Sequence, residues 1–269
     1  MDWIQASIIA LIQGLTEFLP ISSSAHLLFP SLLLGWPDQG LTFDVAVHLG
    51  SLLAVVIYLR NDLIGMVQGL WQWRQEQRLN PQATLALMLI LATLPAVFFG
   101  LVLKDWITVH ARALWVVAAT TLGFGLLLGW ADWRSRRQHS MAAMSWRHTL
   151  VIGLAQALAL VPGTSRSGIT MTAALMLGYT REAAARFSFL MSIPIILAAS
   201  SLMTFELATA AVAVAWAPML LAFVVSFGSA WLCIVLFMQV ISRMGMWPFV
   251  VYRIVLGVGL CWLILPTLR

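Results

Sequence analysis

Long stretches without a charged side chain constrain the fold of this chain more than any other feature of its sequence. A transmembrane helix needs about 20 predominantly apolar residues, and none of these stretches alternates as a β-barrel strand would. With 61% hydrophobic and 9% charged residues, the chain also lacks the polar surface of a soluble protein of this length. We therefore predict an all-α polytopic membrane protein with six full transmembrane helices. They correspond to 45–59 with its flanks, 83–103, 113–131, 187–205, 207–242 and the apolar stretch that ends at 268.

A second feature is an internal repeat. The segment Gln13–His26 recurs in outline as Gln156–Ile169, at a constant offset of 143 residues. Each copy places a serine-rich polar loop between apolar stretches. The residues that are identical to the one 143 positions later are Gln13, Leu15, Ser22, Ser24, Leu34 and Gly35. We predict a duplication with repeat 1 at about 1–131 and repeat 2 at about 146–269, within a single membrane domain of residues 1–269.

The apolar pieces that flank each loop are too short to cross a bilayer. We therefore predict that each repeated motif is a re-entrant helix–loop–helix hairpin, in which Pro20 and Pro162 help to end the first half-helix. Irregular backbone at membrane depth is tolerated where it is buried in protein or lines a wet cavity. Both serine-rich loops are thus expected near the middle of the membrane.

The basic residues predict an orientation. Six spans and two hairpins place ten arginines on one side and three basic residues on the other. The first group is Arg60, Arg74, Arg78, Arg134, Arg136, Arg137, Arg147, Arg181, Arg186 and Arg243, and the second is Lys104, Arg112 and Arg269. The positive-inside rule then puts both termini outside the cytoplasm and makes the repeats inverted, a topology whose broken helices converge on a site near the midplane. The same rule accounts for the net charge of +5, so we expect no nucleic-acid partner.

The first loop offers a carboxylate, hydroxyls and an imidazole. Glu17 is costly at mid-membrane unless it meets a cation, a metal ion or water. Gln13 lies one helical turn before Glu17, so both side chains can face one ion or phosphate. Ser22, Ser23 and Ser24 are potential ligands or nucleophiles, and His26 is a potential base. The structural alternatives are an arginine partner for Glu17 and ordinary capping by the serines.

The second loop offers an arginine among small residues. A guanidinium beside Ser165 and Ser167 matches a bidentate phosphate clamp, and Arg166 is in that position. Gly163 and Gly168 let backbone amides approach an anion, and the following half-helix would direct its positive end at that anion. The alternative is that Arg166 pairs with Glu17, which is compatible with the first interpretation. Weaker candidates are His48, Ser51, Thr170, Ser188 and Arg253, the last of which we expect to snorkel to the interface.

Both motifs resemble the signatures of the bacterial undecaprenyl-diphosphate phosphatases, the bacitracin-resistance family, and the similarity extends nearly end to end. The resemblance implies removal of the terminal phosphate of undecaprenyl diphosphate at the periplasmic face of the bacterial inner membrane. This reaction recycles the lipid carrier for peptidoglycan and other envelope polymers. It also implies bacitracin resistance, since bacitracin competes by sequestering the substrate.

The resemblance also implies roles for individual residues. Glu17 would belong to a metal-assisted carboxylate motif, Ser22 and Ser23 to a hydroxyl pair, His26 would be the catalytic imidazole and Arg166 the diphosphate clamp. The motif is often written with a second Glu where this chain has Gln13, and an amide can ligate a cation but cannot act as a base.

The mechanism expected from these assignments leaves the nucleophile open. Mg²⁺ or Ca²⁺ would be held by Glu17 and Gln13, while the serines, Gly168 and Thr170 contact the substrate phosphates. His26 would serve either as a base for Ser23 or as the nucleophile or base for water.

Two other function classes are open at this stage. A transporter or lipid flippase is the main alternative, because inverted repeats with broken helices also suit alternating access. A structural or partner-binding membrane protein fits poorly with so many polar groups at mid-depth. Besides the lipid substrate and surrounding membrane lipids, a homodimer through glycine-rich faces such as Gly123–Gly125 or Gly257–Gly259 is a further expectation.

Overall fold

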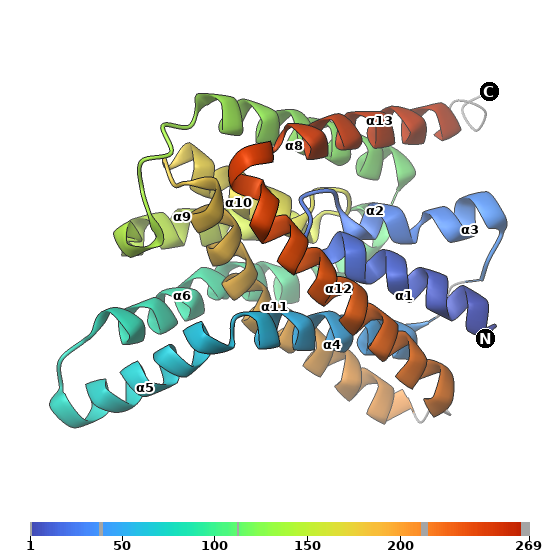
Figure 1. Ribbon diagram of the computed structural model, residues 1–269. Coiled ribbons are helices and arrows are strands. Elements are labelled where there is room, and N and C mark those ends of the chain that lie inside the picture. Colours follow the sequence, from blue (N-terminus) through green and yellow to red (C-terminus); the bar gives the residue numbers. More distant parts are fainter. Residues whose placement is uncertain (1, 38–39, 112, 211–214, 265–269) are drawn as a thin grey trace.

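The computed structural model describes residues 2–37, 40–111, 113–210 and 215–264, so Arg112 and Arg269 of the charge count lie outside it. The described residues form helices and no strand. Short apolar helices lie beside longer ones, and Figure 1 labels most of them. The α-helices are α1 (Trp3–Glu17), α2 (Ser23–Leu27), α3 (Phe29–Leu34), α4 (Leu41–Tyr58), α5 (Arg60–Glu76), α6 (Pro81–Val102), α7 (Lys104–Trp106), α8 (Leu114–Arg134), α9 (Trp146–Ala157), α10 (Arg166–Met176), α11 (Arg181–Ala210), α12 (Trp216–Met244) and α13 (Trp247–Ile264).

Six of these helices are long and apolar enough to cross a membrane, namely α4, α6, α8, α11, α12 and α13. They overlap the six predicted spans, so the prediction of a multi-pass all-α membrane protein is confirmed. Two details differ from the sequence prediction. Helix α11 extends to Ala210 and α12 begins at Trp216, so the stretch 207–242 belongs to two helices. Helix α5 was not predicted; it forms a hairpin with α6, in which the Asn80 side chain accepts from Ala83 N at 2.8 Å and donates to Gly69 O at 2.9 Å.

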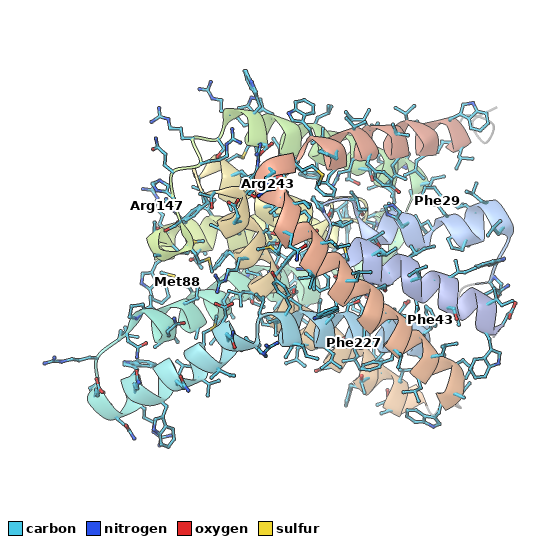
Figure 2. The ribbon with its side chains drawn as sticks, viewed as in Figure 1. Phe29, Phe43, Met88, Arg147, Phe227 and Arg243 are labelled. Atoms are coloured by element: carbon cyan, nitrogen blue, oxygen red, sulfur yellow. The ribbon has the colours of Figure 1, made fainter. Side chains whose placement is uncertain are left out.

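The two halves of the chain exchange partners across the molecule. Helix α1 packs against α12 and α9 packs against α6, while α4 lies against α11 and α8 against α13. In Figure 1 helix α1 starts at the right-hand end and runs toward the centre, whereas α9 starts from the opposite end. Figure 2 labels Arg147 on the left of the molecule, Phe29 and Phe43 on the right, and Arg243 between them. We call the left-hand end, which carries Arg147, the arginine-rich end. The arginine-rich end is also where Arg181 holds Asp132 in a bidentate pair at 2.6 and 2.8 Å.

Each repeated motif forms a helix–loop–helix unit, and the two units match in detail. Their first helices begin at Trp3 and Trp146, and the residue before each caps the helix: Asp2 Oδ1 accepts from Ile4 N at 3.1 Å, and Ser145 Oγ accepts from His148 N at 3.3 Å. Both loops turn on a serine with positive φ, 76° at Ser22 and 68° at Ser165. The two serines are 143 residues apart, so the repeat seen in the sequence extends to the backbone conformation.

Candidate active site

The two serine-rich loops contact each other directly. The Ser24 hydroxyl accepts from Gly163 N at 3.2 Å, and the Ser167 hydroxyl donates to Leu19 O at 2.8 Å. Within each loop the paired serines also share a hydrogen bond, at 3.1 Å between the Ser22 and Ser24 hydroxyls and at 3.3 Å in the second copy. The loops therefore form one polar unit assembled from residues about 140 positions apart in the sequence.

Arg253 connects this unit to the surrounding helices, and our prediction that it snorkels to the interface is wrong. Its side chain is fully buried, with 0% exposure. The guanidinium donates to carbonyl oxygens of both loops and of α8. These bonds reach Pro20 O at 3.4 Å, Gly163 O at 3.0 Å, Thr164 O at 3.0 Å, Thr120 O at 3.3 Å and Thr121 O at 3.1 Å. Loop carbonyls have no helical partner, so a buried arginine satisfies them better than one at the membrane surface would.

Glycine is required at one point of the second loop. Gly163 has a φ of +87°, and a Cβ there would lie 2.5 Å from Val117 O and 2.3 Å from the Thr120 hydroxyl. The same hydroxyl donates to Pro162 O at 2.6 Å. The loop can therefore lie directly against α8, and α10 begins immediately after it with the Ser165 hydroxyl accepting from Gly168 N at 3.2 Å.

Glu17 is the centre of the polar cluster. Its Oε1 accepts from Arg166 Nη2 at 3.0 Å, and its Oε2 accepts from Ser23 Oγ at 2.9 Å and from Gln13 Nε2 at 3.0 Å. The side chains of Glu17 and Arg166 are only 9% and 13% exposed. A buried carboxylate needs this compensation, and the arrangement brings an acid, a hydroxyl and a guanidinium from both repeats to one point.

A cavity of about 270 Å³ opens over this cluster. Its polar lining comes from both loops and from α4, and its apolar lining comes mainly from α11. The polar residues are Glu17, Ser22, Ser23, Ser24, His48, Ser165 and Arg166, and the apolar ones are Ala159, Ile195, Ile196 and Ala199. A polar floor beside an apolar wall suits an amphipathic ligand with an anionic head.

His26 does not line this cavity. Its Nδ1 donates to Ser22 O at 2.7 Å, which leaves Nε2 to accept from the Tyr252 hydroxyl at 2.7 Å. The imidazole also stacks on the Tyr252 ring, with centroids 5.5 Å apart and planes at 7°. Both ring nitrogens are thus engaged behind the loop, where they hold the backbone of Ser22 in place.

His48 lines the cavity, although it was only one of the weaker candidates in the sequence. Its Nδ1 donates to Asp44 O at 2.7 Å, one helical turn earlier in α4. Its Nε2 has no hydrogen-bond partner within the described residues, and the ring lies close enough to Glu17 to interact with its charge. The local signal in the sequence was slight, since a histidine in an apolar helix is more often a core residue than a site residue.

The other predicted residues lie behind the cavity wall. The Thr170 hydroxyl bonds to Arg166 O at 2.8 Å and to the Ser188 hydroxyl at 2.7 Å, so it supports α10 against α11. Ser167 and Gly168 serve the loop contacts described above. Gln13 is fully buried, and its Oε1 has no hydrogen-bond partner among the described residues.

A divalent cation would find oxygen donors here, which Mg²⁺ and Ca²⁺ prefer. Glu17 supplies a carboxylate, and Gln13 Oε1 is an unsatisfied acceptor next to it. Among the described residues no group of three or more His, Cys, Asp or Glu side chains gathers to hold a metal. These residues fit a cation that completes its coordination with substrate oxygens and water.

Comparisons with known proteins agree on one relationship. Residues 6–259 match the family model described as "Bacitracin resistance protein BacA". The chain is 58% identical over 260 residues to a protein of Alcanivorax borkumensis named undecaprenyl-diphosphatase, covering 97% of this chain and 98% of the relative. A protein of Chromohalobacter salexigens with the same name is 55% identical over 263 residues, with coverage of 97% and 98%.

Proposed function

This chain belongs to the bacitracin resistance protein BacA family, and we infer that it is a multi-pass membrane phosphatase that hydrolyses undecaprenyl diphosphate to undecaprenyl phosphate and inorganic phosphate. The observation that carries this inference is the Glu17 carboxylate, which gathers the Ser23 hydroxyl and the Arg166 guanidinium at the floor of one cavity. The name of both relatives describes a hydrolase, which favours catalysis over the transport alternative.

In the first step Ser23 is the nucleophile. Glu17 Oε2 accepts the Ser23 hydrogen bond at 2.9 Å, so it is placed to take the proton as Oγ attacks the terminal phosphorus. The bond from phosphorus to the bridging oxygen breaks, and undecaprenyl phosphate leaves. Arg166 turns its guanidinium toward the transferring phosphoryl group, and the N-terminal amides of α10 add positive partial charge. The leaving group is a phosphate anion, so its departure needs no strong acid.

In the second step water attacks the phosphoserine. His48 Nε2 takes a proton from the water and passes it to the departing phosphate, the bond from phosphorus to Ser23 Oγ breaks, and Glu17 returns its proton to that oxygen. Inorganic phosphate is released with Ser23 regenerated. This assignment moves the imidazole function from His26 to His48, because His48 has a free nitrogen at the cavity whereas both nitrogens of His26 are engaged. His26 then acts as a positioning residue for Ser22.

Mg²⁺ or Ca²⁺ would be held by Glu17 and Gln13 Oε1 together with substrate oxygens. A bound cation would supply charge neutralisation for the diphosphate. Glu17→Gln is expected to abolish turnover with or without added metal, because it removes both the proposed base and the proposed metal ligand. Turnover that is indifferent both to this substitution and to chelation would remove the metal from the proposal.

The re-entrant, inverted arrangement is also part of the proposal. Helices α1 and α10 have 15 and 11 residues, which at about 1.5 Å per residue is too short for a hydrocarbon core of about 30 Å. Both helices have one end at the cavity, and α1 and α9 start from opposite ends of the molecule. These features support two hairpins that enter from opposite faces and meet near mid-depth. We place the opening of the site on the periplasmic side of the bacterial inner membrane, opposite the arginine-rich end.

We also propose a homodimer, which would use only one glycine from each of the faces Gly123–Gly125 and Gly257–Gly259. A Cβ at Gly125 or Gly257 would meet Arg253 at 2.9 Å or Leu122 at 2.4 Å, so these glycines serve the packing of α8 on α13. Gly123 and Gly259 have open space around the Cβ position and are the ones available to a second copy. Light scattering of the purified protein in detergent tests this, and a monomer would remove the dimer from the proposal.

The deciding experiment measures phosphate release from undecaprenyl diphosphate by the purified protein in detergent, with Mg²⁺ or EDTA. Ser23→Ala and Arg166→Ala should abolish release, while Ser31→Ala, a change in α3 outside the cavity, should leave it unchanged. Bacitracin should lower turnover in proportion to the substrate that it sequesters. Absence of release by well-folded wild-type protein would overturn the inferred function.

A further inference from the structure

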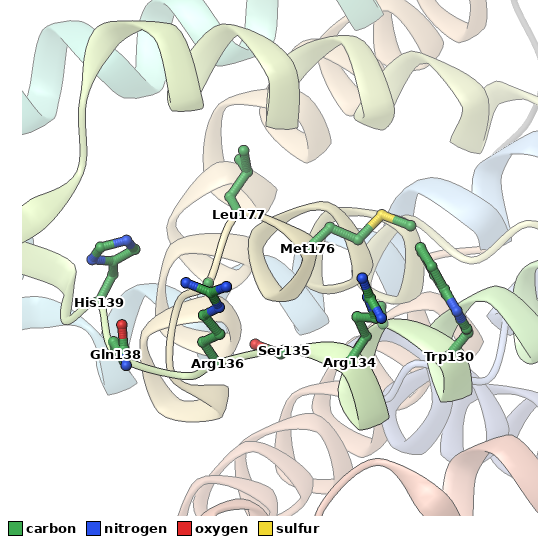
Figure 3. Close-up of a pocket in the computed structure, with 10 residues that line it drawn as sticks. Trp130, Arg134, Ser135, Arg136, Gln138, His139, Met176 and Leu177 are labelled. Carbon is green, nitrogen blue, oxygen red and sulfur yellow. The ribbon is translucent and has the colours of Figure 1, made fainter.

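A second cavity of about 440 Å³ lies at the arginine-rich end. Its wall is formed by the last turn of α8, the segment after it, and the end of α10 with the following turn. Figure 3 shows the Arg134 and Arg136 side chains extending in the same direction, between Gln138 and His139 on one side and Trp130 on the other. The cavity shares no residue with the lining of the candidate active site.

The rim of this cavity is held by backbone hydrogen bonds. Gln138 N and His139 N both donate to Gly178 O, at 2.9 and 3.0 Å, and Thr180 N donates to His139 O at 2.9 Å. Gly178 has a φ of +86°, and a Cβ there would lie 3.2 Å from the His139 ring. The segment after α8 is therefore fixed against the turn after α10, and the hollow between them is a defined feature of the fold.

The two arginines in the cavity have no ion-pair partner among the described residues, unlike others at this end of the molecule. Arg181 pairs with Asp132, and Asp132 also accepts from Met246 N at 3.2 Å, so this buried carboxylate is already committed. Two helix C-termini face the cavity, each with roughly half a negative charge. Two full guanidinium charges exceed that sum, so the cavity keeps an excess of positive charge.

Apolar side chains complete the lining. Trp130 is 48% exposed and Met176 is 47% exposed, and both border the cavity together with Leu177. Arg134 and Arg136 also border a neighbouring hollow that contains Trp133. The cavity lies where α8, a helix long and apolar enough to cross a membrane, ends, and the end of such a helix is expected near the lipid headgroups. Basic pockets between helices at this level are suited to anionic lipid headgroups.

We propose that this cavity binds the headgroup of an anionic phospholipid. Arg134 and Arg136 hold the phosphate, since guanidinium forks match phosphate oxygens. Ser135 and Gln138 face the glycerol hydroxyls, and the acyl chains follow Trp130 and Met176 into the bilayer. The site is separate from the candidate active site and does not depend on the phosphatase function.

The test is native mass spectrometry of the full-length protein in detergent, titrated with phosphatidylglycerol, cardiolipin or phosphatidylcholine. Wild type should retain one anionic lipid in preference to phosphatidylcholine. The double variant Arg134→Gln/Arg136→Gln should bind the anionic lipid at least about tenfold more weakly than wild type. The matched control Arg74→Gln/Arg78→Gln removes two exposed arginines at the same end that do not line the cavity, and it should bind like wild type.

Several outcomes would overturn the proposal. Equal weakening in both double variants would mean a general attraction of the basic end for anionic lipid. Equal affinity of wild type for phosphatidylcholine would remove the headgroup assignment. Displacement of the lipid by millimolar inorganic phosphate would make the cavity a free-anion site. If the double variant unfolds, Met176→Glu, which adds a carboxylate to the apolar wall, should weaken anionic lipid selectively; unchanged binding there also contradicts the proposal.

Discussion

The two oxygens of the Glu17 carboxylate are shared by three donors, so each neighbour of this residue depends on the others. Arg166 occupies Oε1, and Ser23 and Gln13 share Oε2. When Arg166 turns to a phosphate, it leaves a carboxylate with a stronger tendency to take the Ser23 proton. The ion pair of the free protein is thus compatible with the clamp role, as both were open from the sequence.

Arg166→Lys keeps the positive charge but loses the planar fork that can bridge carboxylate and phosphate oxygens. We expect phosphate release to fall about 100-fold, the usual cost of losing a donor to a transition-state oxyanion. The measurement is kcat with undecaprenyl diphosphate under saturating conditions. Arg147→Lys, an exposed position at the arginine-rich end, is the control. Near-normal turnover in Arg166→Lys would refute the clamp assignment.

His48→Gln removes the base proposed for the second step while keeping a polar side chain. We expect kcat to fall by a factor of about 100 or more, with label from the terminal phosphate accumulating on Ser23. His26→Gln should slow the formation of phosphoserine without such accumulation, because it disturbs only the position of the loop. His110→Gln, outside the cavity, should behave as wild type. Unchanged phosphate release in His48→Gln would reassign the role of base in the second step to His26 or to Glu17.

Among the structural elements, α13 is connected through the Arg253 side chain to both loops and to α8, a connection that we call the fastener role of Arg253. Arg253→Met would remove five hydrogen bonds, three of them to loop carbonyls outside any helix, and each buried carbonyl left unsatisfied costs about 1 to 3 kcal/mol before relaxation. We expect a net loss of roughly 3 kcal/mol, measured as a lower midpoint of thermal unfolding in detergent. Arg243→Met, at an exposed position, should leave the midpoint unchanged. Equal midpoints for Arg253→Met and wild type would contradict the fastener role.

The turn before α10 allows a sharper comparison between two glycines. Gly163→Ala forces a Cβ into a positive-φ position that lies 2.5 Å from Val117 O, whereas Gly228→Ala places it in open space. We expect Gly163→Ala to destabilise the protein by about 1 to 3 kcal/mol and to lower activity by displacing the loop. Gly228→Ala should be neutral in both measurements. A neutral Gly163→Ala would mean that the loop adapts, and that its position does not depend on contact with α8.

Local patterns in the sequence predicted most of these elements but not the contacts between them. Apolar stretches and missing charges predicted the six spans, and the repeated motif predicted both loops and the approach of Arg166 to Glu17. The role of Arg253 was missed because two of its partners, Thr121 and Pro20, lie 132 and 233 residues away in the sequence. Neither arginine chemistry nor span position shows that a side chain turns inward. His26 and His48 differ in whether Nε2 is engaged, which depends on Tyr252 and on the helical register of α4.

In the molecule as a whole, helices of each half pack against helices of the other, and this packing brings the two loops into contact. Each loop has the same positive-φ serine and the same serine–serine contact, yet one contributes a carboxylate and the other a guanidinium. A duplicated scaffold therefore holds two chemically different loops face to face. The opposite orientations proposed for the two halves would bring the loops together end to end.

This orientation gives the last prediction. In a variant with Cys233 and Cys261 replaced by alanine, single cysteines at Ile4 and Gln75 mark opposite ends of the molecule; both positions are exposed. In spheroplasts we expect an impermeant maleimide to label Ile4→Cys at once and Gln75→Cys only after permeabilisation, because the positive-inside rule predicts that the arginine-rich end faces the cytoplasm. The reverse labelling pattern would mean that the protein has the opposite orientation, with the opening of the site toward the cytoplasm. Labelling of both in intact spheroplasts would show that the two ends lie on the same side, which is incompatible with the proposed spans.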